Sequence, residues 1–336
     1  MRQLRIWLGS AISLAFLVLL LWRVDRVELW AALRQVNAWW LLPALGAFAL
    51  SIAVRVVRWR IILDRVQPVP TSDAAELLLI GAAANNILPA RTGEIVRAVL
   101  LQRRHGGSMV TALGTIVVER IFDGLILALM LAATLAVLGS NTVLRNVALV
   151  AGAAFTAIAL VLVALAPLPV LTRRLIDAVL TVPPAAIGGP LRALANRFLD
   201  GLTSLGGPRT WALVATASAA TWMLEGASYW LVGIGFGLPL SPIVYLAVCG
   251  AANLTVAVPS TSGAIGPYEF LAREVVVYFG ASAAAGTAYA IGVHAFVLLP
   301  VTLVGLLLLW RRDLGLGDLA RAEGIEAGSD RAEVPR

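Results

Sequence analysis

Residues 85–99 read NNILPARTGEIVRAV, a polar stretch inside an apolar segment that runs from about 74 to 101. A second apolar segment, about 242–279, is interrupted in a similar way by Asn, Pro and Gly residues. Because proline and glycine break helices, each segment is predicted to form a helix, an interruption and a second helix. In membrane proteins this pattern is typical of re-entrant hairpins and discontinuous helices.

The composition is that of a membrane protein. Of 336 residues, 60% are hydrophobic and 13% are charged, whereas a soluble domain has about 45–50% and about 25%. The formal net charge is +7, but the sequence contains no nucleic-acid module signature and no basic stripe interleaved with aromatics, so a nucleic-acid partner is not expected. Cys249 is alone, which excludes an internal disulfide.

Apolar runs near or above the roughly 20 residues that cross a bilayer occur six times. They cover about 6–22, 39–57, 109–138, 147–166, 211–236 and 283–310. The first run follows Arg2 and Arg5 and is not followed by a small-residue cleavage site, which favours a retained signal anchor. The expected fold is therefore all-α: one polytopic domain over 1–312 with about six full transmembrane helices and two re-entrant segments.

In this topology, most arginines lie on one side of the membrane. They follow the second span, the first broken segment, the fourth span and the last span. The positive-inside rule then places both termini in the cytoplasm of a multi-pass cell-membrane protein. Residues 167–208 are expected to be a cytoplasmic linker with amphipathic helices near 171–180 and 191–205, and 313–336 a disordered cytoplasmic tail.

The two broken segments resemble each other. The first reads GAAANNILPARTGEI from Gly81, and the second GAANLTVAVPSTSGAIG from Gly250. This likeness indicates either an inverted internal repeat or a coincidence in a chain rich in Ala and Gly. In inverted-repeat transporters the paired broken helices meet near mid-membrane and form the substrate site. The expected break or hinge residues are Pro89, Gly93, Pro259 and Gly266.

Within the opening stretch, Arg91, Glu94 and Arg97 recur every three residues, on one face of a helix that starts near Thr92. A helix N-terminus offers free N–H groups and a positive dipole end, and arginine offers a planar fork suited to phosphate. The pattern predicts an anion site. The alternative is an interfacial helix start whose Arg and Glu side chains neutralise one another.

A second charged cluster lies inside the third span. Glu119 and Asp123 share a helix face, and Arg120 and Asp123 are close enough to pair. Ionisable groups within a membrane indicate function by default. The alternative is a solvated salt bridge at a helix end.

The second broken segment supplies hydroxyls from Ser260, Thr261 and Ser262, with Gly263 allowing close backbone approach. Glu269 follows at the next helix start, where it either contributes to the site or caps the helix.

Two further ionisable residues lie within predicted spans. Glu225 is a weaker candidate that either acts in the site or pairs with a buried arginine, and His294 is expected to be a core histidine. No His, Asp, Glu and Cys set has zinc spacing, so no metal is expected.

Three motifs occur in order: NILPARTGEIVR from Asn86, ERIFD from Glu119, and PSTSGAIGPYE from Pro259. Together they resemble the transmembrane domain of the lysylphosphatidylglycerol synthase/flippase-like family over about residues 5–312. The resemblance implies a flippase-like role. Its aminoacyl-transferase domain has no counterpart here, so lipid aminoacylation is not expected.

The expected function is translocation of a phosphate-containing lipid, either a phospholipid or a polyprenyl-phosphate-linked glycolipid. Membrane lipids with anionic head groups are the expected partners, with no cofactor and no P-loop. Transport is expected to be passive or coupled to an ion or proton through a buried carboxylate. The expected substrate-binding residues are Asn86, Arg91, Glu94, Arg97, Glu119, Arg120, Asp123, Ser260, Thr261, Ser262, Gly263 and Glu269.

Two alternatives remain. One is a membrane-embedded enzyme acting on a lipid-linked substrate, although PSTSG at 259–263 lacks the histidine of the lipid-phosphatase element that it partly matches. The other is an accessory subunit in cell-envelope lipid or glycan biosynthesis, with a lipid-modifying enzyme as its partner.

Overall fold

The structure is a computed structural model. It describes residues 14–21, 24–88, 92–139, 142–165, 207–255 and 262–312, with a few single residues between 173 and 196. The linker helices expected near 171–180 and 191–205 and the tail expected at 313–336 lie outside these described ranges. Every regular element in the described ranges is a helix, as the sequence predicts.

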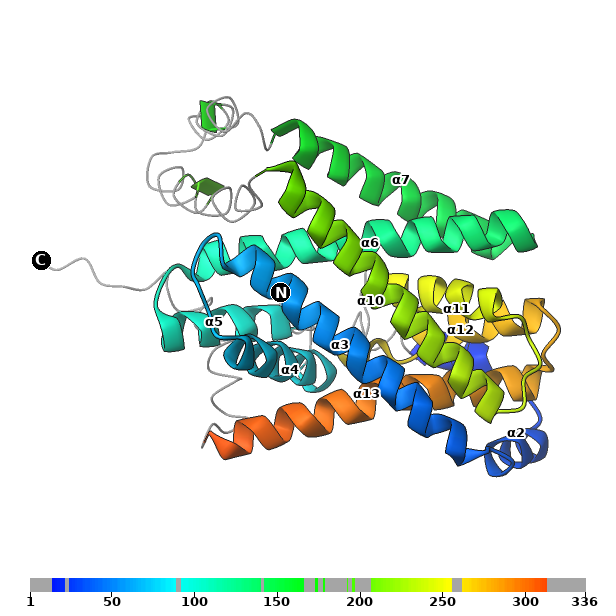
Figure 1. The fold of residues 1–336 in the computed structure, drawn as a ribbon. Coiled ribbons are helices and arrows are strands. Elements are labelled where there is room, and N and C mark those ends of the chain that lie inside the picture. The colour runs from blue at the N-terminus through cyan, green and yellow to red at the C-terminus, as the bar shows by residue number, and fades with distance from the viewer. Residues whose placement is uncertain are drawn as a thin grey trace, which may run out of the picture.

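Five long helices form the body of the molecule (Figure 1). They are α3 (Leu41–Leu63), α6 (Met109–Leu138), α7 (Thr142–Leu165), α10 (Pro208–Gly235) and α13 (Ala283–Arg311). Among the described residues, three helical stretches are both long and apolar enough to cross a membrane: Ala38–Leu63, Met109–Leu138 and Ala283–Arg311. A membrane protein is therefore supported, while the count of six full spans stays a prediction.

The second span is longer than its hydropathy indicates. The apolar run ends near residue 57, but α3 continues to Leu63. The expectation that Arg55 and Arg58 follow the second span is wrong, because both belong to this helix and Arg58 is fully buried. Short helices complete this region: α2 (Arg26–Arg34), which Asp25 caps, and η1 (Ala38–Trp40).

The first broken segment is a helical hairpin made of α4 (Thr71–Ile87) and α5 (Gly93–His105). Its two ends meet, since Arg104 Nη2 lies 2.8 Å from Glu76 Oε1 and His105 Nε2 lies 3.0 Å from Asp73 Oδ2. The chain therefore enters and leaves this hairpin at one end of the molecule. Helix α4 begins at Thr71 after Pro70, and Asp73 lies in its first turn.

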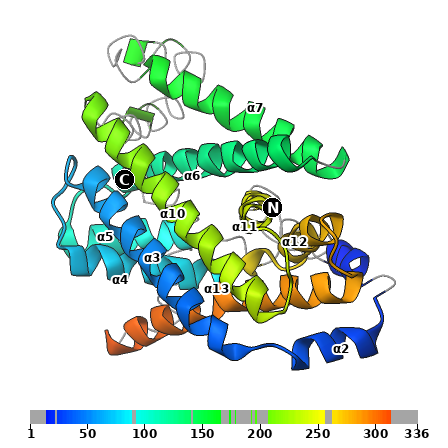
Figure 2. The ribbon, with the colours of Figure 1, turned by 45° about the vertical axis from the view of Figure 1, so that its right-hand side comes forward.

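The second broken segment is also a hairpin, with α11 (Pro242–Leu254), η4 (Ser262–Ala264) and α12 (Pro267–Tyr278). Its base packs on the start of α13, where the Tyr245 and Tyr289 ring centroids are 5.7 Å apart. The base of the first hairpin is joined to the other end of α13 through Arg312 and Glu76, at 2.8 Å. The hairpins thus extend from opposite ends of α13 (Figure 2).

The tips of the two hairpins meet in the middle of the molecule. The Ser262 hydroxyl donates a hydrogen bond of 2.8 Å to the Leu88 carbonyl, and Asn86 Nδ2 donates one of 2.9 Å to Thr302 Oγ1 on α13. Gly263 has a φ of 71°, a conformation that glycine adopts without strain. Of the expected hinge residues, Pro89 and Pro259 lie outside the described ranges.

Glycine allows the helices of the first hairpin to pack backbone against backbone. A Cβ atom added at Gly93 would lie 2.0 Å from the Gly81 carbonyl oxygen and 2.7 Å from the Asn85 side chain. The hairpin therefore depends on glycine at position 93.

We expect Gly93→Ala to lower thermal stability, because the added methyl group separates α4 from α5 at the tip. The matched control is Gly46→Ala on α3, where a Cβ atom meets nothing within 4 Å. Alanine there should leave stability unchanged or raise it, since glycine in a helix costs about 1 kcal/mol relative to alanine. Thermal unfolding of both purified variants in detergent checks this, and equal melting temperatures would contradict it.

Candidate functional site

A cavity of about 200 Å³ lies where the two hairpin tips meet α3, α6, α10 and α13. Its wall combines apolar side chains with a group of polar and charged ones. Three guanidinium groups, two carboxylates, three amides, a tyrosine and a histidine line it: Arg55, Arg97, Arg120, Glu94, Glu225, Asn85, Asn86, Asn253, Tyr268 and His294.

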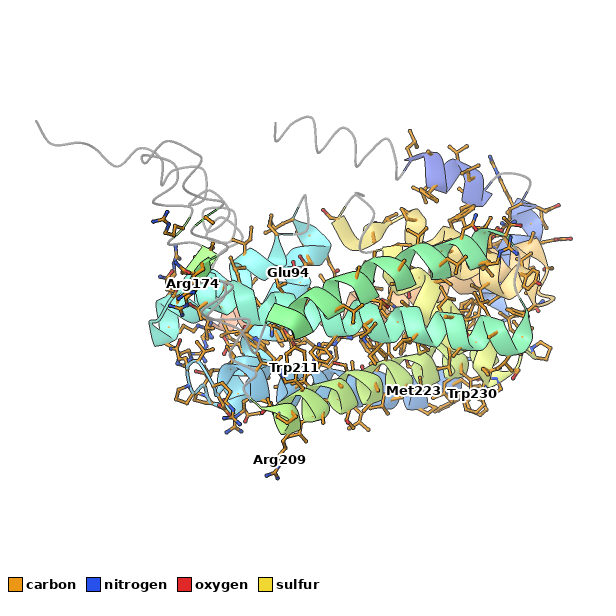
Figure 3. The ribbon with its side chains drawn as sticks, turned by 90° about the horizontal axis from the view of Figure 1, so that it is seen from above. Glu94, Arg174, Arg209, Trp211, Met223 and Trp230 are labelled. Carbon is orange, nitrogen blue, oxygen red and sulfur yellow. The ribbon has the colours of Figure 1, made fainter. Side chains whose placement is uncertain are left out.

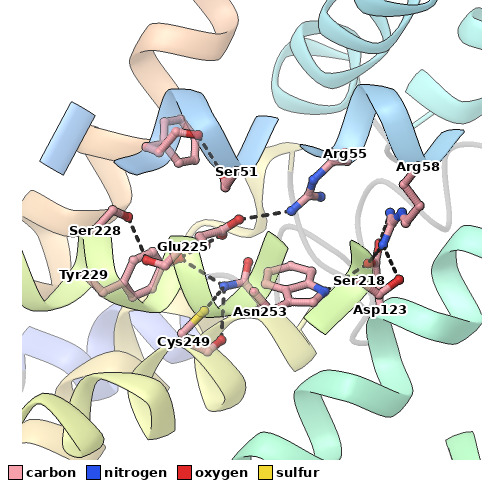
Figure 4. A network of polar contacts seen from close by, with 12 residues as sticks. Ser51, Arg55, Arg58, Asp123, Ser218, Glu225, Ser228, Tyr229, Cys249 and Asn253 are labelled. Carbon is pink, nitrogen blue, oxygen red and sulfur yellow. Dashed lines mark hydrogen bonds and ion pairs between the residues drawn. The ribbon is translucent and has the colours of Figure 1, made fainter. Parts of the chain in front are cut away.

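Behind this wall, Arg58 joins three helices. Its side chain is 0% exposed. Nη2 of Arg58 lies 3.2 Å from Glu119 Oε1 and 3.2 Å from Asp123 Oδ2 on α6, and Nη1 donates a hydrogen bond of 2.8 Å to Ser218 on α10. Figure 4 shows Arg58 beside Asp123 and Ser218. A buried charge is tolerated when it is paired and hydrogen-bonded, so Arg58 is the internal counterion of both carboxylates.

Arg97 of α5 shares Glu119 with Arg58. Its Nη2 atom forms an ion pair of 2.8 Å with Glu119 Oε2, and its guanidinium lies 3.3 Å from the centroid of the Trp59 ring. Trp59 in turn donates a hydrogen bond of 3.3 Å to Thr115. A cation over an indole face is favourable when desolvated, so Arg97 is held in one position at the cavity wall.

Arg120 is held more loosely. Its single ion pair among the described residues is with Asp123, at 3.6 Å, and its side chain is 36% exposed. Because Arg58 and the Trp222 indole, at 2.9 Å, also bind Asp123, that carboxylate does not depend on Arg120. Arg120 is thus the most exposed of the three arginines that line the cavity.

The cavity wall also carries a separate ion pair between α3 and α10. Arg55 Nη2 lies 3.0 Å from Glu225 Oε2, and the Arg55 guanidinium lies 4.8 Å from the centroid of the Trp222 ring (Figure 4). Of the two sequence interpretations of Glu225, the pairing with a buried arginine is present, and Glu225 also lines the cavity.

Asn85 and Asn86, at the tip of the first hairpin, have different hydrogen-bond partners. Asn85 Oδ1 accepts a hydrogen bond of 2.7 Å from the Gly93 amide, and its Nδ2 donates one of 3.0 Å to Glu94. Asn85 therefore satisfies a backbone group freed at the break, and α5 begins directly after Thr92, near where the sequence predicts it. Asn86 does not do this, because its amide bonds α13 instead.

At the second tip, Glu269 both caps α12 and orients a histidine. Its Oε2 accepts a hydrogen bond of 2.7 Å from the Gly266 amide, and its Oε1 lies 2.7 Å from His294 Nδ1. The His294 ring stacks on Tyr268 with centroids 4.0 Å apart. Of the two interpretations of Glu269, helix capping is present, and its second oxygen fixes a histidine of the cavity wall.

A tyrosine pair connects the second tip to α10. The Tyr229 and Tyr268 hydroxyls are hydrogen-bonded to each other, and Asn253 Nδ2 donates to Tyr229 at 3.0 Å. The Tyr229 hydroxyl also points to Glu225 Oε1, at 3.5 Å.

The structure brings most of the predicted residues together. Asn86, Gly93, Glu94, Arg97, Arg120 and Gly263 line the cavity. Glu119 and Asp123 lie behind the arginines as counterions, and the Ser262 hydroxyl is used in the contact between the tips. Arg91, Ser260 and Thr261 lie outside the described residues.

Several residues of the wall are not among the predicted set: Arg55, Asn253, Tyr268 and His294. The sequence spacing of Arg55 and Arg58 indicates that Arg55 belongs to the helix. Arg55 and Arg58 lie three residues apart and share the face of α3 that carries Trp59. A helix that begins as an apolar run can continue beyond its first charged residue when arginine and aromatic residues follow at helical spacing.

The arrangement suits an anion. Arginine forks bind phosphate through paired hydrogen bonds. The described residues include no group of three or more His, Cys, Asp and Glu that could hold a metal ion.

A comparison with protein families identifies one match. The model described as lysylphosphatidylglycerol synthase TM region matches residues 6–305. A comparison with curated proteins finds no match.

The two arginines of α3 and α6 should differ in their structural role. Replacing Arg58 by Met leaves Glu119 and Asp123 without their shared cation, and breaking a buried pair costs about 3–5 kcal/mol. Arg120→Gln removes only a partly exposed pair, and such pairs contribute about 0–1 kcal/mol. We expect a large fall in melting temperature for Arg58→Met and a small one for Arg120→Gln. Thermal unfolding in detergent checks this, and the reverse order would contradict it.

Proposed function

Since the chain belongs to the family described as lysylphosphatidylglycerol synthase TM region, a membrane family of lipid-related processes, we propose that it moves a phosphate-containing lipid between the two leaflets. The observation that carries this proposal is the polar cavity between the hairpin tips, with three arginines on its wall. Arginines held inside a membrane protein are costly, and such sites mark substrate pathways.

In this proposal the lipid phosphate binds Arg120 first, and Arg97 and Arg55 also line the cavity. The asparagine amides and Glu94 offer hydrogen-bond partners to hydroxyl or amine groups of the head group. At about 30 Å³ for each water molecule, the cavity of about 200 Å³ has room for a small head group. The acyl chains stay in the bilayer outside it.

The two hairpins act as gates in this mechanism. Each is re-entrant, and they enter from opposite membrane faces as an inverted pair. Their contact at Ser262 and Leu88 separates the two sides. Displacing one tip opens the cavity to one face while the other tip keeps the opposite face closed, which is alternating access around a fixed site.

The arginines of the described residues support an orientation. One end of the bundle carries Arg60, Arg65, Arg103, Arg104, Arg209, Arg311 and Arg312. Figure 3 shows Arg174 and Arg209 toward this end and Trp230 toward the other. The opposite end carries fewer: Arg26, Arg34, Arg145 and Arg273. We place the arginine-rich end in the cytoplasm by the positive-inside rule.

This orientation predicts the accessibility of the hairpin bases. Ser72, at the base of the first hairpin, and Ser241, at the base of the second, are both exposed. We expect Ser72→Cys to react with a membrane-impermeant maleimide only from the cytoplasmic face, and Ser241→Cys only from the outer face. The buried native Cys249 should not react. Labelling of both positions from the same face would refute the re-entrant pair.

Translocation itself can be measured in liposomes. We expect the reconstituted protein to move fluorescently labelled phosphatidylglycerol or a labelled polyprenyl phosphate between leaflets without changing it chemically. Arg120→Gln should slow this movement at least tenfold, because the cavity loses its loosely held guanidinium. Arg34→Gln, on the exposed face of α2, is the matched control and should behave as the wild type.

Leaflet accessibility to dithionite gives the rate, and mass spectrometry of the recovered lipid gives its identity. A chemically modified lipid would support the membrane-embedded enzyme instead. Equal rates for Arg120→Gln and Arg34→Gln would contradict the assignment of the anion site.

A further inference from the structure

Glu225 lies in the cavity wall with one cation to neutralise it. Its residue is 5% exposed, and Arg55 is its sole ion-pair partner among the described residues, at 3.0 Å. The Tyr229 hydroxyl, at 3.5 Å, and Asn253 next to it are neutral (Figure 4). The charge of Glu225 therefore depends on where the Arg55 side chain points.

An anionic head group competes with Glu225 for Arg55. Arg55 also lines the cavity, and its guanidinium lies 4.8 Å from the centroid of the Trp222 ring, which lines the cavity as well. When Arg55 binds a phosphate, Glu225 is left as an unpaired carboxylate in a desolvated site. Such a group becomes neutral by binding a proton, because an isolated buried charge is far more costly than a neutral acid.

We propose that Glu225 is the proton-coupling site of the transporter: it binds one proton when Arg55 turns to the lipid phosphate and releases it when the lipid leaves. This inference rests on the proposed function and adds a driving force for lipid translocation, the proton gradient. In the coupling step the Arg55–Glu225 ion pair breaks, a proton from water in the open cavity forms an O–H bond at Glu225, and the phosphate takes over the guanidinium. One negative charge enters with one positive charge, so the loaded site has the same net charge as the empty one.

The other charged and titratable groups around Glu225 do not lose their partners in this step. From α6, Asp123 keeps Arg58 and Trp222 as partners even when Arg120 binds the phosphate. From α11 and α12, the neighbouring groups are the neutral side chains of Cys249, Asn253 and Tyr268. Beyond Tyr268, Glu269 and His294 are paired with each other. Glu225 is thus the carboxylate that loses its ion-pair partner when the substrate binds.

The pH gradient provides the test. Liposomes that contain the protein and labelled phosphatidylglycerol or polyprenyl phosphate receive a gradient of one pH unit, with valinomycin and equal potassium holding the membrane potential at zero. Transport of one proton per lipid drives the leaflet ratio of the label toward tenfold, since one pH unit corresponds to a factor of ten. An enclosed pH dye should report proton movement that depends on the labelled lipid.

Three variants give the assignment its controls. Glu225→Gln cannot bind the proton, so its leaflet ratio should stay near one and its lipid-dependent proton movement should disappear. Glu225→Asp keeps the carboxylate and should restore part of the gradient response. Glu28→Gln, on the exposed face of α2, should respond as the wild type. Each variant must first match the wild type in melting temperature to within a few degrees.

The outcomes separate the two proposals. If the wild type equilibrates the label between leaflets but its ratio stays near one under the gradient, the proton coupling is overturned and the translocator stands. If the Glu225→Gln variant keeps the full gradient response, coupling occurs elsewhere and the assignment to Glu225 is overturned. If neither labelled lipid moves, both proposals are overturned.

Discussion

Burying charge inside an apolar helix bundle is the constraint on which this structure depends. Arg58 of α3 is fully enclosed, and it is stable there because Glu119 and Asp123 of α6 and Ser218 of α10 surround its guanidinium. Because a lone ion in such a place costs several kcal/mol, each of these helices requires the other two. The cluster therefore sets the relative positions of α3, α6 and α10, and with them the wall of the cavity.

The hairpins solve a related problem for the backbone. Where a helix breaks inside an apolar region, its free N–H and C=O groups need partners. Asn85 supplies one to Gly93, Glu269 supplies one to Gly266, and Ser262 donates to the Leu88 carbonyl of the other hairpin. Satisfying these groups gathers polar side chains at the two tips. The polar groups around the cavity are thus a consequence of breaking two helices whose tips meet.

The arginines around the cavity differ in how firmly they are held, and this difference gives the site its chemistry. Arg58 and Arg97 have strong internal partners: both pair with Glu119, and Arg58 also pairs with Asp123. Arg120 and Arg55 have one ion-pair partner each among the described residues. A phosphate can take these two without unfolding the cluster behind them. Firm pairs provide the scaffold, and in the proposed function the loose pairs provide the exchange of partners that lipid transport requires.

Local pattern alone determined much of this protein: the helical content, the two broken segments, the helix start at Thr92, and the shared face of Glu119 and Asp123. Only the tertiary structure decided that α3 continues past its first arginines, that Arg58 is the counterion of α6, and that Glu225 pairs with Arg55, 170 residues away. The reason is physical. Hydropathy and helix periodicity act over one or two turns, whereas the cost of burying an arginine depends on a carboxylate from a distant helix. A hydropathy window therefore ends the predicted span at such an arginine. In the folded chain Arg58 stays inside the bundle because Glu119 and Asp123 of α6 pair with it.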